Sequence, residues 1–380
     1  MTVALDRLIL YSTLVMSLLV IAPPVLHAQI GEVEILTLIS GKSTSDDKRV
    51  YITGLLVDSA RNKVACLVRT YEHDLPITED AFMAGVVKPW MWSTYFAIYD
   101  LDCTKLLYAT YLGGSDSDVA GALSWDEFGT QLIIAGTTKS SDFPVTGNAR
   151  QSRLNGPKDL WYARFDMDTQ TFTYISYLGG NGYESYGRIT ITKNKQLIIS
   201  GYSSSSNLPM KPGTFSRRPD ENGDATVFIL SRDSLLHAVS FGGKSDETVL
   251  HVIETDDAFV IVGPTWSSDF PVTENAFQPS FGGIEDVFVL RTDKEFRSIE
   301  YCSYLGGISN DVMQMALCVG GLIHIVGQVN GVEHYPLTHP THGFGDSLGI
   351  WDAFYAIYDP ESDSFPFSSL IRGQNAHILK

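Results

Sequence analysis

Cysteine is scarce in this chain of 380 residues, which contains only Cys66, Cys103, Cys302 and Cys318. These residues are too few and too dispersed for a scaffold that is held together by disulfides. No CxxC pair occurs, which excludes the usual structural zinc sites. The chain must instead fold around a hydrophobic core, for which 44% hydrophobic and 11% aromatic residues are ample.

Positive charge is also in short supply. The chain has 27 Lys and Arg against 44 Asp and Glu, which gives a formal net charge of −17. Such a charge repels nucleic acid and anionic lipid, and it attracts cations or basic partners. We therefore exclude a role in binding DNA or RNA. A Gly-rich phosphate loop that opens a helix is missing too.

Only one long hydrophobic run is present, and it lies near the N-terminus. Arg7 precedes the uncharged stretch Leu8–Ile21, and Leu26-His27-Ala28 follows. This order predicts a secretory signal peptide over residues 1–28, cleaved after Ala28, and a mature domain over residues 29–380. An uncleaved membrane anchor is the alternative, although the run is short for a bilayer span. Once the signal is removed, we expect no membrane span.

The chain is built from repeats. The stretch Ser140–Thr146 returns letter for letter at Ser267–Thr273. A strand-like segment that ends in Gly occurs six times, at Glu34–Gly41, Leu106–Gly114, Thr173–Gly180, His237–Gly243, Glu300–Gly307 and Phe367–Gly373. The final glycines are 73, 66, 63, 64 and 66 residues apart, which defines five repeat units at about 42–114, 115–180, 181–243, 244–307 and 308–373.

Aligning the units predicts four strands in each, the fourth being the segment that ends in Gly. The first strands are expected at Val50–Val57, Val119–Trp125, Gly187–Thr192, Val249–Glu254 and Val312–Cys318. The second strands are expected at Val64–Val68, Gln131–Gly136, Gln196–Gly201, Phe259–Gly263 and Leu322–Gly327. The third strands are expected at Thr94–Tyr99, Leu160–Phe165, Ala225–Leu230, Val287–Arg291 and Ala353–Tyr358. Short polar turns join the first two strands, as in hairpins.

A proline motif follows each second strand, as in Asp142-Phe143-Pro144. Because proline cannot donate to a sheet ladder, it marks the point where the chain leaves the sheet. We expect the large residue before it to fill a gap between neighbouring sheets. Five four-stranded units predict an all-β fold, a five-bladed β-propeller, with a solenoid as the alternative. Copies of the fourth strand at both chain ends predict closure of the ring by N- and C-terminal strands. Whether Glu34–Gly41 replaces Phe367–Gly373 or adds an outer strand stays open.

Together these motifs resemble a known family. Tyr-Leu-Gly-Gly, Ser-Ser-Asp-Phe-Pro-Val-Thr, Asn275-Ala276-Phe277-Gln278 and a Gly-Gly pair before Asp286-Val287-Phe288 are similar to the bacterial secreted β-propeller (SBBP) repeat. The resemblance covers about Glu34–Gly373, although five repeats depart from the seven blades in the family's name. It implies a bacterial protein that is secreted or held in the cell envelope, without an assigned reaction or catalytic residues.

Acidic residues recur four positions after the final Gly of four units: Asp118, Glu184, Glu247 and Asp311. One interpretation is that they cap backbone N–H groups of the Gly turns. Another is that they ring one mouth of the central channel and hold a calcium ion, the only cofactor that the sequence indicates. A third is a glycosidase with two of these carboxylates in a central funnel.

Residues present in only one unit are better candidates for ligand binding, because a functional site on a ring must break its symmetry. They are Trp90 and Trp92 in the first unit, Arg217 and Arg218 in the third, and His334, His339 and His342 in the fifth. Ser347 lies in a GxSxG sequence, but the flanking strand and helix of a hydrolase elbow are not expected there. Cys66 and Cys103 share one unit, so a disulfide between them is a further prediction. The alternative, a small buried hydrophobic residue, is favoured for Cys302 and Cys318.

The function predicted from the sequence is that of an exported, non-catalytic scaffold or binding module. We expect its ligand, a protein or a glycan, to contact the loops on one face. The alternative is a carbohydrate-active enzyme with carboxylates in the funnel.

Overall fold

The computed structural model describes residues 50–86, 88–219, 222–340, 342–343 and 351–372. The regular elements of these residues are β-strands, arranged in five sheets. The first sheet contains β1 (Val50–Asp58), β2 (Lys63–Thr70), β3 (Ser93–Asp100) and β4 (Leu106–Leu112). The second contains β5 (Asp118–Trp125), β6 (Gln131–Thr138), β7 (Asp159–Asp166) and β8 (Thr171–Leu178). The third contains β9 (Glu184–Ile191), β10 (Leu197–Ser203), β11 (Asp224–Ser231) and β12 (Ser234–Phe241).

The fourth sheet contains β13 (His251–Glu254), β14 (Ala258–Thr265), β15 (Asp286–Asp293) and β16 (Ile299–Leu305). The fifth contains β17 (Asp311–Val319), β18 (Leu322–Val329), β19 (His342–Gly343), β20 (Asp352–Asp359) and β21 (Ser364–Arg372). The strands of the first four sheets pair antiparallel in chain order, and each sheet draws its strands from one repeat unit.

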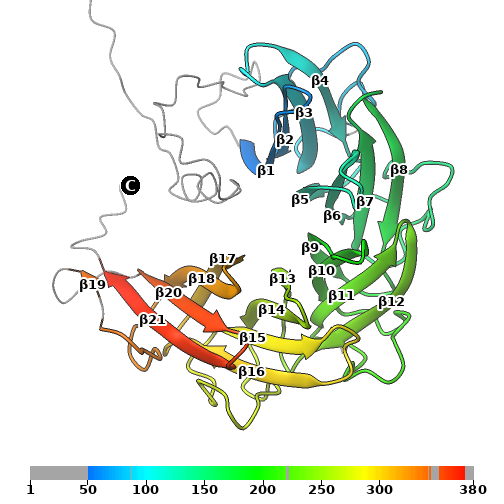
Figure 1. The fold of residues 1–380 in the computed structure, drawn as a ribbon. Helices are drawn as coiled ribbons and strands as arrows, with labels where there is room; N and C mark the ends of the chain where they lie inside the picture. The colour runs from blue at the N-terminus through cyan, green and yellow to red at the C-terminus, as the bar shows by residue number, and fades with distance from the viewer. Residues whose placement is uncertain (1–49, 87, 220–221, 341, 344–350, 373–380) are drawn as a thin grey trace, which may run out of the picture. The chain divides into compact units, whose positions relative to one another are not determined.

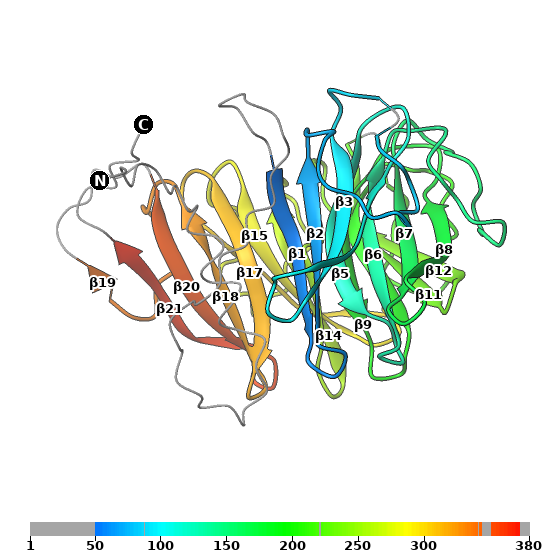
Figure 2. The ribbon, with the colours of Figure 1, turned by 90° about the horizontal axis from the view of Figure 1, so that it is seen from above.

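The five sheets follow one another in chain order as the blades of a β-propeller (Figure 1). The first strand of each blade lies on the inner side, and β1 contacts β5, β5 contacts β9, and β13 contacts both β9 and β17. Seen after a turn of 90°, the strands run alongside one another, so that the loops gather at two ends (Figure 2). The predicted five-bladed all-β propeller is therefore confirmed.

Burial explains why strand alternation is visible in some strands and hidden in others. The first strand β5 alternates between buried and half-buried residues, because one face lines the inside of the ring. In β6 and β7, by contrast, every residue but one terminal residue is buried, because neighbouring blades cover both faces. Such strands appear in the sequence as continuous apolar runs, so aligning the repeats located them better than alternation could.

The two chain ends bear on the predicted closure of the ring. The C-terminal copy of the fourth strand forms β21 in its own blade, where it pairs antiparallel with β20. An extra outer strand in this blade comes from β19, which pairs parallel with β21. The N-terminal copy, Glu34–Gly41, and the predicted signal peptide lie outside the described residues, so closure by the N-terminal segment stays a prediction.

The large residue of each proline motif is buried, and in four of the five motifs it lies between blades, as the sequence predicts. Phe143 is 3% exposed, and its ring lies 4.9 Å from that of Trp161, in a core to which the first and second blades contribute. Phe270 is 3% exposed and stacks on Phe288 at 4.8 Å. Leu208 and Tyr335 occupy the same place in the third and fifth blades, whereas Leu75 is buried in a core that the first blade forms by itself.

The tyrosine of the Tyr-Leu-Gly-Gly motif holds the proline motif of its own blade in place. The hydroxyl of Tyr177 donates to the carbonyl oxygen of Ser140 at 2.7 Å and accepts from the N–H of Phe143 at 3.0 Å. Tyr304 makes the same two bonds to Ser267 and Phe270. Because backbone groups buried without a partner are costly, the two motifs occur together.

Removing this hydroxyl should leave one buried N–H and one buried carbonyl without a partner. We therefore expect Tyr177→Phe to lower the free energy of unfolding by about 1–3 kcal/mol, measured by urea titration. The matched control is Tyr174→Phe on the same strand. The Tyr174 hydroxyl accepts from the N–H of Arg150 and from the Tyr162 hydroxyl, both at 3.1 Å, but bonds no carbonyl oxygen, so this variant should lose less stability. Equal stability of wild type and Tyr177→Phe would contradict the role of the bridge.

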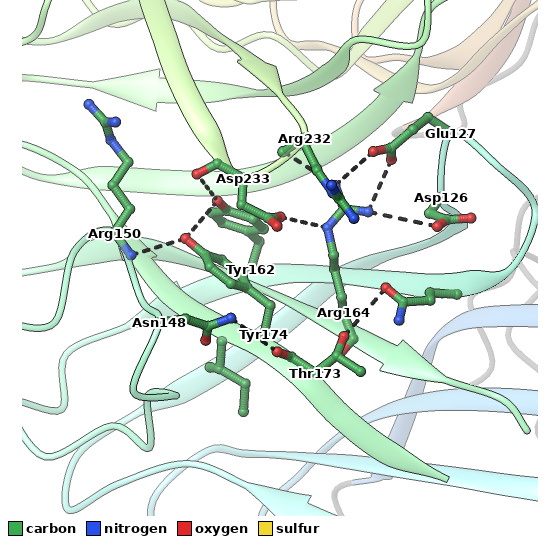
Figure 3. Close-up of polar contacts among 12 residues, drawn as sticks. Asp126, Glu127, Asn148, Arg150, Tyr162, Arg164, Thr173, Tyr174, Arg232 and Asp233 are labelled. Carbon is green, nitrogen blue, oxygen red and sulfur yellow. Dashed lines mark hydrogen bonds and ion pairs between the residues drawn. The ribbon is translucent and has the colours of Figure 1, made fainter. Parts of the chain in front are cut away.

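A buried ion cluster joins the second and third blades (Figure 3). Arg164 of β7 is 4% exposed. Its guanidinium donates to both carboxylate oxygens of Glu127 at 3.0 and 3.2 Å, and its Nε donates to Asp233 of the next blade at 2.6 Å. A fourth hydrogen bond reaches the carbonyl oxygen of Arg232 at 3.2 Å. One side chain thus connects two turns that lie in different blades.

The predicted disulfide is not formed, because Cys66 and Cys103 are both thiols in the structure. Cys66 packs in the core of the first blade, where burial raises the pKa of its thiol to about 12. Cys103 lies in the turn between β3 and β4, at a positive φ of 53°. Cys302 is a buried thiol, as expected, whereas Cys318 is exposed. Within the described ranges, no helix is long and apolar enough to cross a membrane.

Candidate functional site

The four acidic residues that follow the Gly turns are capping groups. Each carboxylate accepts the N–H of the turn's last Gly: Gly114 to Asp118 at 2.6 Å, Gly180 to Glu184 at 3.1 Å, Gly243 to Glu247 at 3.1 Å, and Gly307 to Asp311 at 2.7 Å. Hydroxyl groups of the same blade donate to the other oxygen in three of them, from Thr138, from Ser203 and Ser205, and from Thr265. The capping interpretation is confirmed.

The calcium interpretation finds no support in the described residues. Asp118, Glu184, Glu247 and Asp311 are all 0% exposed, and each is bonded to the Gly turn that ends the preceding repeat unit. Among the described residues, no three His, Cys, Asp or Glu side chains come together as metal ligands. Burial raises the pKa of Asp118 to about 6 and those of Glu184, Glu247 and Asp311 to about 7.

The blade order places a different set of side chains together on the inner side of the first three blades. A cavity of about 570 Å³ opens there, which we call the inner basic pocket. Its lining includes Thr53, Arg69, Thr137, Lys158, Tyr186 and Arg188. Three of these six side chains carry positive charge, in a chain with a net charge of −17.

Arg69 enters the pocket from the end of β2. Its guanidinium lies 4.4 Å above the ring of Trp92 and 5.0 Å from that of Tyr51. Stacking on aromatic faces fixes the plane of a guanidinium while leaving its N–H groups available. The Nε of Arg69 is buried and has no hydrogen-bond partner among the described residues.

Arg188 and Lys158 complete the positive wall. Arg188 of β9 donates to the carbonyl oxygen of Gly121 at 3.0 Å, while its buried Nε has no partner in the described part of the chain. Burial lowers the pKa of its guanidinium. Lys158 donates to the hydroxyl of Ser185 at 2.8 Å, and burial together with Lys139 lowers its pKa.

No described carboxylate compensates these three charges. The ion pairs of the described residues involve other cations, such as Arg61, Arg164 and Arg291. Nearby His251 adds no charge at neutral pH, because burial and Arg188 lower its pKa to about 4. Cations removed from water without an anion raise the free energy of the empty pocket. The inner basic pocket is therefore prepared for an anionic group.

Tyr186 lines the pocket in an unusual backbone conformation. Its φ is 79°, in the left-handed region that a Tyr rarely adopts, and the register of β9 and β10 shifts at this point. The side chain is 51% exposed. Strained backbone of this kind is found more often at functional sites than elsewhere.

The aromatic residues predicted from the first unit differ in their location. Trp92 lies beside the pocket, because it supports Arg69, with its ring 4.4 Å from that of Tyr71. Trp90 is 74% exposed and contacts the ring of His73 at 5.6 Å. Only Trp92 is thus brought to the candidate site.

The predicted arginines of the third unit are structural. Arg217 binds both oxygens of Asp224, at 2.8 and 2.6 Å. It takes the place that Gln151 holds in the second blade, where the Gln amide donates to Asp159 at 2.7 Å. The statement that Arg217 lacks a counterpart is therefore wrong. Arg218 donates to the carbonyl oxygen of Ser206 at the surface.

The predicted histidines do not gather into a metal site in the described part of the structure. His334 is exposed at a φ of 63°, and exposed His339 stacks on Phe367 at 4.7 Å. His342 belongs to β19, of which only the backbone pairing is described. Ser347 lies outside the described residues.

A second cavity, of about 380 Å³, lies between the third and fourth blades. Its charged side chains already have partners. Lys294 pairs with Glu254 at 2.8 Å, and Lys211 donates to the carbonyl oxygen of Glu295 at 3.0 Å. Since these lysines already have partners, this cavity is a weaker candidate for ligand binding than the inner basic pocket.

Comparison with known proteins gives distant likenesses. No family model and no curated protein matches the chain. Among solved structures, it is similar to the NanB sialidase of Streptococcus pneumoniae, with 9% identity and a TM-score of 0.46 over 87% of this chain and 62% of that one. A glycoside hydrolase family 43 arabinoxylan arabinofuranohydrolase from Bacillus subtilis gives 10% identity and a TM-score of 0.38, over 83% of this chain and 64% of the other. The phage phi92 endosialidase gives 10% identity and a TM-score of 0.43, over 85% of this chain and 59% of the other. The chain thus spans less than two thirds of the length of each.

Proposed function

We propose that the protein is a non-catalytic β-propeller module that binds an anionic group of its ligand in the inner basic pocket. The observation that carries the proposal is that Arg69, Lys158 and Arg188 share one cavity without a carboxylate partner among the described residues. Pairing with an anion would recover the free energy that their desolvation costs. Arginine side chains also suit the planar geometry of a carboxylate.

Binding is favoured over hydrolysis by the position of the acids. A glycosidase needs two carboxylates in different environments that face one substrate cavity. Here Asp118, Glu184, Glu247 and Asp311 are buried in their own Gly turns. No Asp or Glu is among the described residues that line the inner basic pocket. The pocket can hold an anion but offers no acid and base pair.

We further propose that the chain is exported and acts at the cell surface or in the envelope, as a member of the SBBP repeat family. The hydrophobic run Leu8–Ile21 after Arg7 and the repeated Tyr-Leu-Gly-Gly and Asp-Phe-Pro motifs support this placement. The family resemblance extends through all five blades.

Arg188→Gln should weaken anion binding. We expect wild type to bind at least one of citrate, galacturonate and inorganic phosphate at low ionic strength, as measured by calorimetry. Losing one charge-assisted hydrogen bond of about 1.5–3 kcal/mol should raise the Kd by about 10- to 100-fold. Added salt should weaken binding as well, because the attraction is electrostatic.

The matched control is Arg297→Gln, which removes the same charge from a side chain that is 69% exposed and remote from the pocket. It should bind the anions as wild type does. Equal losses of affinity in both variants would show that the net charge of the protein, rather than the pocket, explains the effect. If wild type binds none of the three anions, the proposed function is refuted.

A further inference from the structure

We infer that the ligand of the inner basic pocket is an acidic sugar, a pyranose that carries a carboxylate. This inference rests on the proposed function and adds the chemical class of the ligand. It follows from three features of the pocket: its size, the neutral polar groups beside its cations, and the exposed aromatic ring of Tyr186.

The size of the pocket excludes a bare inorganic anion as the best fit. A cavity of about 570 Å³ falls within the range of roughly 300–1,000 Å³ that is usual for small organic ligands. An inorganic anion that neutralised the cations would leave most of this space to water. A ligand that fills the pocket needs an uncharged body attached to its acid group.

The remaining polar groups of the lining suit sugar hydroxyls. Thr53, Thr137 and Ser185 contribute hydroxyl groups, of which that of Thr53 already donates to the carbonyl oxygen of Leu67 at 3.4 Å and is left as an acceptor. Ser185 also accepts from Lys158, so the cation and a neutral hydroxyl stand side by side on one wall. A carboxylate at the cations would place the rest of a pyranose among these hydroxyls.

Tyr186 supplies the flat apolar surface that a sugar ring packs on. It lies two residues after Glu184, and the residues two after the equivalent carboxylates of the other blades are Ala120, Val249 and Met313. The aromatic ring and the strained backbone therefore occur together in the third blade, next to Arg188. The register shift itself recurs in the first strands of the first, second and fifth blades, whereas the positive φ, among the described residues, occurs at this position only in Tyr186.

Lys158 breaks the symmetry in the same way. It directly precedes the Asp that opens a third strand, and the residues in its place in the third, fourth and fifth blades are Gly223, Glu285 and Trp351. The first blade has Trp92 there, which supports Arg69. The positions that vary between blades thus converge on one pocket.

The test compares galacturonate with galactose, citrate and inorganic phosphate by calorimetry, using wild type, Tyr186→Phe and Tyr186→Ala. We expect galacturonate to bind wild type at least 10-fold more tightly than the other three probes. Tyr186→Phe, which keeps the aromatic ring, should retain binding of galacturonate. Tyr186→Ala should bind galacturonate about 10-fold more weakly than wild type, while its affinity for citrate and phosphate stays unchanged.

The outcomes separate this inference from the proposed function. Tight binding of citrate or phosphate without a preference for galacturonate overturns the acidic sugar and leaves an anion-binding module. An equal loss for every probe in Tyr186→Ala also overturns it, because the ring would then shape the pocket rather than contact the sugar. If none of the anions binds, both the inference and the proposed function fail.

Discussion

Arg164→Met is expected to lower the free energy of unfolding by about 3–5 kcal/mol, the usual result of removing one partner from a buried ion cluster. Methionine keeps the length and most of the volume of the side chain, so the loss measures charge rather than a cavity. Urea unfolding followed by tryptophan fluorescence gives the midpoint and slope that this comparison needs.

The size of the effect follows from what Arg164 leaves behind. Glu127 and Asp126 are each 7% exposed, and Asp233 of the next blade would lose its bond to the guanidinium Nε (Figure 3). Carboxylates that remain buried without a cation repel one another and have lost their hydration. The two blades that Arg164 joins should therefore separate more easily.

Arg291 is the matched control, because it holds the same position in the fourth blade. It pairs with Asp257 at 2.9 Å, with Glu300 at 2.8 Å and with Asp363 of the fifth blade at 3.6 Å. Asp257 is 71% exposed, so solvent screens the cluster, and Arg291→Met should cost about 1 kcal/mol. Equal losses in the two variants would show that burial of the cluster does not set its contribution.

The repeated part of the fold was predictable, because five aligned copies average out local ambiguity. The sequence predicts the burial of Phe143, since proline ends the strand and a large residue precedes it in every unit. The bond from Tyr177 to Ser140 was not predictable, although both motifs were recognised. Which hydroxyl reaches which carbonyl depends on how the fourth strand packs against the loop after the second.

The candidate site was mostly hidden from the sequence. Arg69, Lys158 and Arg188 come from three different blades and meet only because the blades are arranged around one centre. The expectation that function breaks the symmetry selected Trp92, which stacks on Arg69 beside the pocket, but it also selected Arg217. Residue type alone could not show that Arg217 donates to Asp224 in the same way as Gln151 donates to Asp159 in the second blade.

The melting temperature is expected to be higher at pH 5 than at pH 8, by about 5 °C. Six carboxyls, of which Glu285 is half-buried and the other five are buried, have pKa values of about 6 to 7 in the folded state, because burial raises them from ordinary values near 4. They are Asp118, Glu184, Glu247, Glu285, Asp286 and Asp311. Calorimetric scans between pH 4 and pH 8 measure the difference.

The sign follows from proton binding. Between about pH 4 and pH 7 the folded state binds more protons than the unfolded state, so the free energy of unfolding falls as pH rises. Below this window, carboxyls with lowered pKa values dominate. Backbone N–H groups lower the pKa values of Asp142 and Asp269, so the contribution of these two carboxylates to the free energy of unfolding is lost in acid. We therefore expect maximal stability in mild acid. A melting temperature that rose from pH 5 to pH 8 would contradict this assignment.

Substitutions of Asp311 and Asp118 can show which carboxyls cause the pH dependence of the melting temperature. The two residues cap equivalent turns but differ in their hydrogen-bond partners. The Oδ1 atoms of Asp311 and Asp286 are both buried without a hydrogen-bond partner among the described residues. Both carboxyls lie beside Gly306, where a Cβ would come within 2.6 Å of Asp286 and 2.7 Å of Asp311. In Asp118, by contrast, hydroxyl groups of Thr138 and Ser140 donate to the two oxygens.

Asp311→Asn should therefore raise the melting temperature at pH 8, because the amide carries no charge and no longer repels Asp286, while its oxygen still caps Gly307. Asp118→Asn should lower it, because the new N–H₂ group faces the hydroxyl of Thr138, which already donates at that position. At pH 5, where Asp311 is protonated and can itself donate, the gain from Asp311→Asn should largely disappear. Opposite signs at pH 8 would assign the pH dependence to the unpartnered carboxyls of the fourth and fifth blades, and equal signs would refute that assignment.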